Sequence, residues 1–305
     1  MDRYFIGSSD IAVILGLNRY KTPLQLWAEL TGQIERPDLS GMEAVEWGKR
    51  LEKSKVIADK FAELHNCKLI AYKKRYVHSE YDYLSCELDT IIAGTDELVE
   101  QKTCSAWQAK NWKGQDEIPA EYICQVMWQL GISGRKKGWI AVLIGGQNYI
   151  EREIVFDEQM FKTMVKKAVE FWEGYIVTKV MPSIVSCNDT DTLYELFPQE
   201  TAGQEIQLGD DMDALIEGLQ GLKADAKALA MSIEKQENEI KVKLQEAEFG
   251  ITPHYRISWK ASSRQQIDTK KLREAVPEIA KKYEREVVSR VLRIKEIKEA
   301  ENGKD

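Results

Sequence analysis

The sequence predicts an α/β protein with a mixed central β-sheet flanked by helices, followed by a helical, coiled-coil-like extension. Residues 1 to about 185 alternate helical and strand patterns, whereas residues from about 208 onward are highly charged and mostly helical in period. A chain of 305 residues with 43% hydrophobic content can fill one α/β core and still carry an appendage. We therefore expect domains over residues 1–197 and 210–305, joined by a linker at 198–209.

Capping signals locate the helices of the first half. Helices are expected over residues 9–16 and 22–32, where a Ser or Thr N-cap opens each segment and a glycine closes it. Ser40 and Glu43 have the spacing of a capping box, which predicts one long helix that continues to about residue 64.

Runs rich in β-branched and aromatic residues predict strands, and turn residues between them predict two hairpins. Gly94-Thr95-Asp96 joins the strands of the first hairpin, and Gly145-Gly146-Gln147-Asn148 joins those of the second. Strands are expected over residues 68–72, 83–92, 98–103, 139–144 and 149–156. One helix is expected to begin at Pro119, and another follows the second hairpin and ends near residue 179.

The first hairpin carries Asp89 on one strand and Glu100 and Lys102 on the next. Side chains two apart on a strand share a face, so Glu100 and Lys102 point the same way. A turn centred on Thr95 and Asp96 makes opposed residue numbers sum to 191. Asp89 is then opposite Lys102 and diagonal to Glu100, whereas an even sum would move Asp89 to the other face.

These side chains predict a hydrolytic metal site. Two neighbouring carboxylates repel each other unless a cation bridges them, and oxygen ligands suit Mg²⁺ or Mn²⁺. Such a metal polarises a phosphodiester and activates water, while Lys102 orients the water and offsets developing charge. The alternative without a catalytic role is an exposed ion pair between Glu100 and Lys102.

The same residues resemble the D…(D/E)-x-K nuclease motif, and specifically the YqaJ-type phage recombinases related to lambda exonuclease. The resemblance covers residues 3 to about 156 and implies a restriction-endonuclease-like core. Further segments match in the family's order: Ile6-Gly7-Ser8-Ser9-Asp10-Ile11, Leu15-Gly16-Leu17-Asn18, Thr22-Pro23-Leu24, Gly48-Lys49-Arg50-Leu51-Glu52, Ile118-Pro119 and Tyr122-Ile123-Cys124-Gln125-Val126.

This resemblance assigns roles to the metal site. It implies that Asp89, Glu100 and the carbonyl of Gln101 bind the metal. Glu52 would lie near a second ion or its waters, and Lys102 would be catalytic.

The resemblance also implies that Gln125 supports the attacking water and that Ser9 holds a terminal phosphate. Independently, Ser8, Ser9 and the first amides of their helix form a ready anion site, although a plain Ser N-cap explains them equally well. Basic and aromatic candidates for phosphate contact and base stacking are Arg3, Arg19, Tyr20 and Trp107.

The function implied is a Mg²⁺-dependent exonuclease that digests duplex DNA from an end, 5′ to 3′. It would leave single strands for an annealing protein in phage-type recombination, and would assemble as a homotrimer. The N-terminus lacks a signal-peptide pattern and no run is long and apolar enough to span a membrane, so we expect a phage- or prophage-encoded protein in the bacterial cytoplasm.

Three alternatives follow from the same residues. A RecB-like nuclease with an iron–sulfur cluster is disfavoured, because the five cysteines form no suitable cluster pattern. A structure-selective or sequence-specific endonuclease would cut closed circular DNA. A DNA-end-binding scaffold would keep the fold without catalysis.

The C-terminal third has its own pattern. Its heptad, read as a helical hairpin or a short coiled coil, fades at Gln236 and Lys243. Residues 255–305 hold 14 Lys or Arg against 9 Asp or Glu in a chain of net charge −7, so basic charge is concentrated at the end. The apolar heptad positions are Met212, Leu215, Leu219, Leu222, Ala226, Leu229, Ile233 and Ile240.

Overall fold

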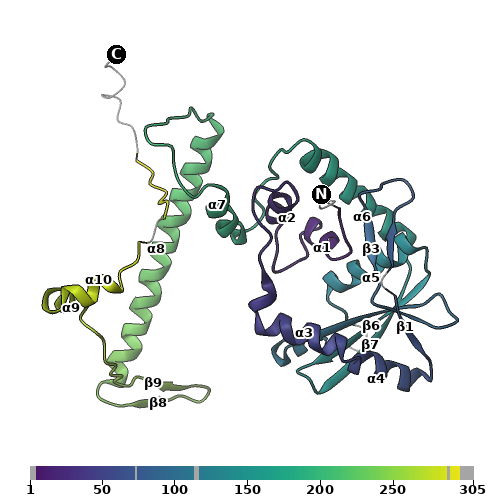
Figure 1. Cartoon of the computed structure of the whole chain (residues 1–305). Helices are drawn as coiled ribbons and strands as arrows, with labels where there is room; N and C mark the ends of the chain where they lie inside the picture. The colour runs from purple at the N-terminus through teal and green to yellow at the C-terminus, as the bar shows by residue number, and fades with distance from the viewer. Residues whose placement is uncertain (1–4, 73, 113–116, 287–288, 296–305) are drawn as a thin grey trace. The chain divides into compact units, whose positions relative to one another are not determined.

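The computed structural model describes residues 5–72, 74–112, 117–286 and 289–295 (Figure 1). It divides into an N-terminal unit that ends at Pro198 and a C-terminal unit that begins at Gln199, and each is described separately. Arg3 lies outside the described residues, and so does the side chain of Glu52.

A five-stranded mixed sheet forms the centre of the N-terminal unit. Strands β5 and β6 pair in parallel, and every other neighbouring pair in this sheet is antiparallel. This confirms the predicted α/β class with a mixed central sheet. In spatial order the strands are β1 (Leu69–Ala71), β4 (Thr90–Ile92), β5 (Leu98–Cys104), β6 (Lys137–Ile144) and β7 (Asn148–Val155).

Helices cover both faces of this sheet because its central strands are apolar on both sides. Leu98 and Ile140 face the larger hydrophobic core, whereas their neighbours Val99 and Ala141 face a smaller one. Helices α1 (Asp10–Ile14), α2 (Pro23–Leu30), α5 (Ala120–Ser133) and α6 (Glu158–Phe171) contribute to the larger core, and α4 (Val56–His65) closes the smaller one.

The long helix predicted over residues 40–64 is wrong. The chain forms α3 (Glu43–Lys53) and then α4, separated at Lys55, which adopts a left-handed conformation with φ of 60°. Before α3, the Asp38 carboxylate accepts the Ser40 amide (2.9 Å) and opens a short 3-10 turn, η1 (Leu39–Gly41), so Ser40 lies in this turn and not at the start of a long helix.

The single strand predicted over residues 83–92 is also wrong. It is interrupted at Leu88 and Asp89, and its first half, β3 (Ser85–Glu87), pairs with β2 (Arg75–Val77) in a separate sheet. The remaining short elements of this unit are η2 (Ala106–Trp112), η3 (Trp172–Val177), η4 (Cys187–Asp189) and α7 (Thr190–Leu196).

The C-terminal unit is built on one helix of 34 residues, α8 (Asp211–Leu244). A β-hairpin follows it, rather than the second arm of a helical hairpin. Among the hydrophobic residues described in this unit, only Leu244 is buried. The hairpin strands are β8 (Phe249–Ile251) and β9 (Arg256–Ser258), followed by α9 (Thr269–Ala275) and α10 (Pro277–Lys282).

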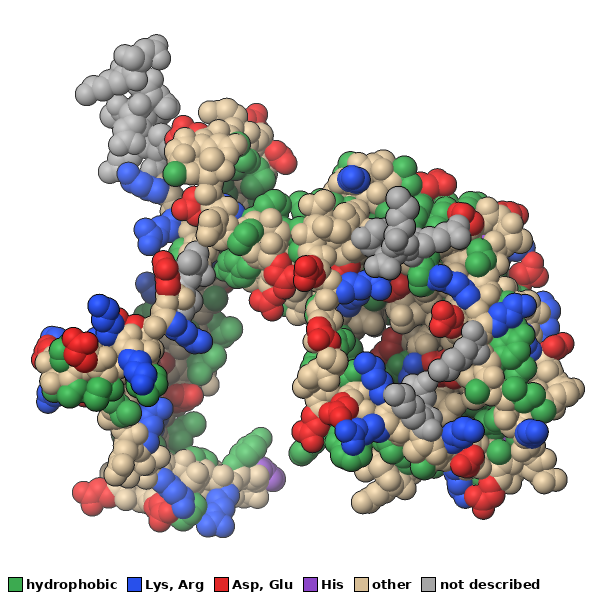
Figure 2. Space-filling model, viewed as in Figure 1, with side chains coloured by type: hydrophobic (Ala, Val, Ile, Leu, Met, Phe, Trp, Pro, Cys, Tyr) green, Lys and Arg blue, Asp and Glu red, His purple; other side chains and the backbone are tan. Residues whose placement is uncertain are grey.

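Surface charge is mixed in sign. Figure 2 shows Lys, Arg, Asp and Glu side chains interspersed over the visible face of the N-terminal unit. None of the helices in the described part of the chain combines the length and apolar character that a bilayer crossing needs.

Candidate active site

The register of β4 and β5 places Asp89 next to the start of the motif on β5. Thr90 pairs with Val99 and Ile91 with Leu98, so opposed residue numbers sum to 189. If this register is continued by one residue, Asp89 lies across from Glu100. The predicted position of Asp89, opposite Lys102, is therefore wrong by two residues along β5. The sum stays odd because the Ile92 amide donates to the Glu97 carbonyl (2.9 Å), which leaves a four-residue loop, 93–96.

Side chains replace the backbone ladder where β4 begins. The Gln101 amide donates to Asp89 Oδ2 (3.1 Å), and Thr90 Oγ1 donates to the Val99 carbonyl (2.9 Å). Because both bonds end on β5, the Asp89 carboxylate is fixed against the strand that carries Glu100. The interruption of the strand at Asp89 thus creates the site rather than disturbing it.

Glu100 lies at the centre of the site and is 2% exposed. Its Oε1 accepts from Lys102 Nζ (2.5 Å) and from Gln125 Nε2 (2.5 Å). A buried carboxylate is costly unless it is paired and hydrogen-bonded, and here every contact donates to it. The structure therefore brings together Asp89, Glu100, Lys102 and Gln125, four of the residues singled out from the sequence.

Lys102 is held as a cation. Burial disfavours its charged form, but the carboxylates of Glu100 and Asp89 outweigh this and raise the pKa of Lys102. The ring of Tyr122 lies 5.8 Å from Lys102 Nζ and is stacked on Trp112, which adds an aromatic wall to the site. A permanently charged ammonium beside the carboxylates suits the orientation of water and of phosphate oxygens.

Gln129 is a site residue that the sequence did not single out. Its Nε2 donates to Glu100 Oε2 (2.7 Å) and to the carbonyl of Glu87 (3.1 Å). These two acceptors fix the amide orientation, since a flipped amide would set oxygen against oxygen. In the sequence, Gln129 could have been recognised by its position one helical turn after Gln125, because the other buried residues of this helix are apolar.

The oxygen donors fit a hard divalent cation. Mg²⁺ accepts one or two carboxylates and keeps several waters, so Asp89, Glu100 and the Gln101 carbonyl form a suitable set. Within the described part of the chain, no group of three or more His, Cys, Asp or Glu side chains could share an ion.

Helix α3 carries Glu52 along β5. A Cβ built on Gly48 would lie 3.4 Å from Thr103 Oγ1, an ordinary van der Waals contact, so this face of the helix packs against β5 at a normal distance. On the same face, Gln101 and Asp89 line a cavity of about 440 Å³, together with Lys55 and Asp59. Gln101 Oε1 is buried in the structure without a hydrogen-bond donor.

The candidate DNA contacts Arg19, Tyr20 and Trp107 lie in two segments that touch each other. Gln108 Nε2 donates to Tyr20 Oη (2.7 Å), which ties the loop after α1 to η2. Tyr20 is 72% and Trp107 89% exposed, as base-stacking groups must be. Arg19 forms an ion pair with Glu121 at 3.0 Å.

The anion site expected at Ser8 and Ser9 is partly filled by the protein itself. Ser9 is the N-cap of α1, as predicted, but makes no side-chain capping bond. The Gly7 amide donates to Asp10 Oδ2 (2.9 Å), so a carboxylate of the chain already occupies one donor that a phosphate would use.

Comparisons with known proteins define the class. Residues 1–136 match the family described as the YqaJ-like viral recombinase domain. The uncharacterized protein YqaJ of Bacillus subtilis (strain 168) is 32% identical over 296 residues, which cover 96% of this chain and 91% of that protein. The chain therefore belongs to the YqaJ family.

The similarity to solved structures is weaker. The alkaline exonuclease LHK-Exo of Laribacter hongkongensis has 16% identity and a TM-score of 0.47, covering 57% of this chain and 89% of that one. A phage related exonuclease of Haemophilus somnus 129PT has 14% identity and a TM-score of 0.44, covering 58% and 97%.

Proposed function

We propose that this protein is a divalent-metal-dependent deoxyribonuclease that hydrolyses duplex DNA from an end. The observation that carries the proposal is the convergence of Glu100, Lys102 and Gln125, with Asp89 fixed beside them on β5. A structural ion pair would not need two carboxylates on neighbouring strands, nor a buried glutamine aimed at one of them.

The metal would be held by Asp89, Glu100 and the Gln101 carbonyl, with Glu52 near a second ion, and Mg²⁺ or Mn²⁺ would supply Lewis acidity and a more acidic water. The protein supplies the remaining steps. Lys102 exchanges its bond to Glu100 for the water and the scissile phosphate, and Gln125 supports the attacking water.

Several finer features are part of the proposal and are supported by family membership and by the motif resemblance. These are digestion from 5′ to 3′, delivery of single strands to an annealing protein, and assembly as a homotrimer around duplex DNA. Tyr20 and Trp107 would stack on bases near the end, Arg19 would contact phosphate, and Ser8 and Ser9 would hold the terminal phosphate. A bacterial cytoplasm would be the setting for this reaction.

The test compares three substrates with Mg²⁺: linear duplex with a 5′-phosphate, the same duplex without it, and closed circular duplex. We expect digestion of linear duplex alone, faster with the 5′-phosphate and abolished in Lys102→Ala. Lys162→Ala is the matched control, because Lys162 forms an exposed pair with Glu158 on α6.

Each other outcome selects a different function. Cutting of the circle would indicate an endonuclease. Tight binding of DNA ends without cutting would indicate a scaffold, and digestion that persists in Lys102→Ala would overturn the assignment of this site.

A further inference from the structure

The apolar heptad of α8 forms a stripe, which we call the seam; it is half-buried at Met212 and Leu219 and exposed from Leu222 onward. It comprises Met212, Leu215, Leu219, Leu222, Ala226, Leu229, Ile233 and Ile240. Leu222 is 69% and Leu229 62% exposed, and hydrophobic side chains reach the surface along α8 in Figure 2. A helix of this length extends about 50 Å, enough for the four or so heptads that a stable coiled coil uses.

The described residues of the C-terminal unit form no hydrophobic core that could hold this helix. Among the hydrophobic residues described in it, Leu244 alone is buried, and it packs near Gly250 of the β8–β9 hairpin. Gly218 and Gly221 lower the intrinsic helix propensity of α8 further. Because most helical stability comes from packing of an apolar face, the seam needs a cover.

We infer that the seam pairs with the seam of a second copy of this chain, in an antiparallel coiled coil. A heptad stripe is complementary to another heptad stripe, since each apolar knob fits a hole of the facing helix. The charges along α8 then decide the direction of the partner.

A parallel pair in register sets like charges against each other. Lys243, which occupies a seam position, would meet its own copy, and the acidic first turn with Asp211 and Asp213 would lie beside another acidic first turn. An antiparallel pair instead brings this first turn beside Lys241 and Lys243 of the second copy. It also opposes the two helix dipoles.

The antiparallel register defines specific neighbours. Leu222 meets Ile233 of the second copy, and Ala226 meets Leu229, so a small residue lies opposite a large one at the centre. Lys223 and Glu237 flank the seam and face each other between copies. Glu237 lies 3.6 Å from Lys241 within its own helix, and its second oxygen can accept from Lys223 of the other copy.

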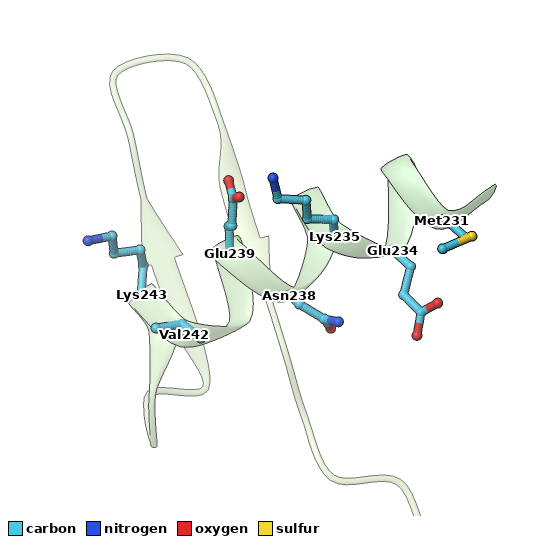
Figure 3. A pocket seen from close by; sticks show the side chains of 7 residues that line it. All are labelled: Met231, Glu234, Lys235, Asn238, Glu239, Val242 and Lys243. Carbon is cyan, nitrogen blue, oxygen red and sulfur yellow. The ribbon is translucent and has the colours of Figure 1, made fainter. Parts of the chain in front are cut away.

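A hollow on the surface of α8 lies away from the seam. It has a volume of about 700 Å³ and lies along this helix, and Figure 3 shows that the side chains lining it all come from α8. Of its lining residues only Lys243 occupies a seam position, so pairing through the seam leaves this hollow uncovered. It is lined by Met231, Glu234, Lys235, Asn238, Glu239, Val242 and Lys243.

Disulfide trapping in the full chain tests the pairing. The background is Cys187→Ser, which removes the exposed thiol and serves as the control. Leu222→Cys and Ile233→Cys are made singly and together, oxidised mildly and resolved without reductant. In the antiparallel pair each single variant lies roughly 16 Å from its own copy, 11 residues along the axis, whereas the double variant lies in contact.

We expect covalent dimers from the double variant alone. Self-linking of both single variants would show a parallel pair and overturn the inference. No linking in any variant would show that something else covers the seam, such as the N-terminal unit or a different protein, and would overturn it as well.

Sedimentation of the full chain provides a second measurement that does not need thiols. Leu222→Asp should lower the mass of the assembly, whereas Ala224→Asp, on the outer face of α8, should not. Equal behaviour of the two variants would contradict the pairing. The proposed nuclease site takes no part in the pairing, so digestion of DNA by the wild type and cross-linking through α8 can succeed or fail separately. If the protein is also a trimeric ring, pairing through α8 would join two rings.

Discussion

In the N-terminal unit, large side chains such as Trp128, Phe61 and Ile140 are fully buried between the sheet and its helices. In the C-terminal unit, by contrast, Leu215, Leu222 and Leu229 of α8 are exposed. The same difference holds for polar groups. Glu100 is buried with donors from three other side chains, but the charged residues of α8 are exposed. The described residues of the first unit form a core and gather the candidate site, whereas those of the second leave most of the apolar stripe of α8 exposed.

The largest expected effect concerns the site of the first unit. Glu100→Gln keeps the shape of the side chain but removes a ligand charge, and the lost stabilisation of several kcal/mol corresponds to about a 1,000-fold loss of cleavage rate. Single-turnover digestion of end-labelled duplex measures it. A loss below tenfold with normal folding would show that Glu100 does not hold the metal.

The second prediction compares the two cores directly. Trp128→Ala should lower the free energy of unfolding by about 3–5 kcal/mol at any protein concentration. Leu229→Ala on the seam should lower it by an amount that depends on concentration, because α8 is stabilised by association. Urea unfolding at two protein concentrations tests both variants. If the effect of Leu229→Ala on the free energy of unfolding does not depend on protein concentration, α8 is not stabilised by association and the two units do not differ in this respect.

A smaller effect is expected from Gln129, which positions Glu100. Gln129→Met keeps the length of the side chain but removes the donor to Glu100 Oε2, so metal affinity should fall about 10- to 100-fold. Calorimetric titration with Mn²⁺ in the absence of DNA measures this loss. If Gln129→Met binds Mn²⁺ as tightly as the wild type but is less stable, Gln129 contributes to packing and does not position Glu100.

The smallest effect concerns Asp10, whose pKa is raised by burial despite the bond from the Gly7 amide. Because the folded protein binds this proton more tightly than the unfolded chain, the wild type loses stability as pH rises from about 4 through the raised pKa. Asp10→Asn lacks this loss, so its stability relative to wild type should increase over that range. Thermal unfolding at a series of pH values provides the measurement.

The sequence was sufficient wherever periodicity alone decides the structure. Alternation along β5 predicts that Glu100 and Lys102 share a face, and they form an ion pair at 2.5 Å. The heptad predicts α8. The N-caps Ser9 and Thr22 locate the first two helices.

What the sequence did not predict depends on contacts between distant segments. Apolar residues continue through Leu88, so nothing local signals that the strand leaves one sheet and enters another there. Lys55 breaks the long helix in a left-handed conformation that its residue type does not favour. Gln129 is a polar residue with no local signal of burial, because contacts with β3 and β5, distant in sequence from α5, bury it.

The most direct test of the proposed two-carboxylate site is the Mg²⁺-dependent release of nucleotides from end-labelled linear duplex by the wild type and by Asp89→Asn. The variant keeps an oxygen that can accept the Gln101 amide, so folding should be preserved. We predict release by the wild type, none in EDTA, and a nearly complete loss in Asp89→Asn. Equal release by the folded variant, or release that persists in EDTA, would contradict a metal site built from Asp89 and Glu100.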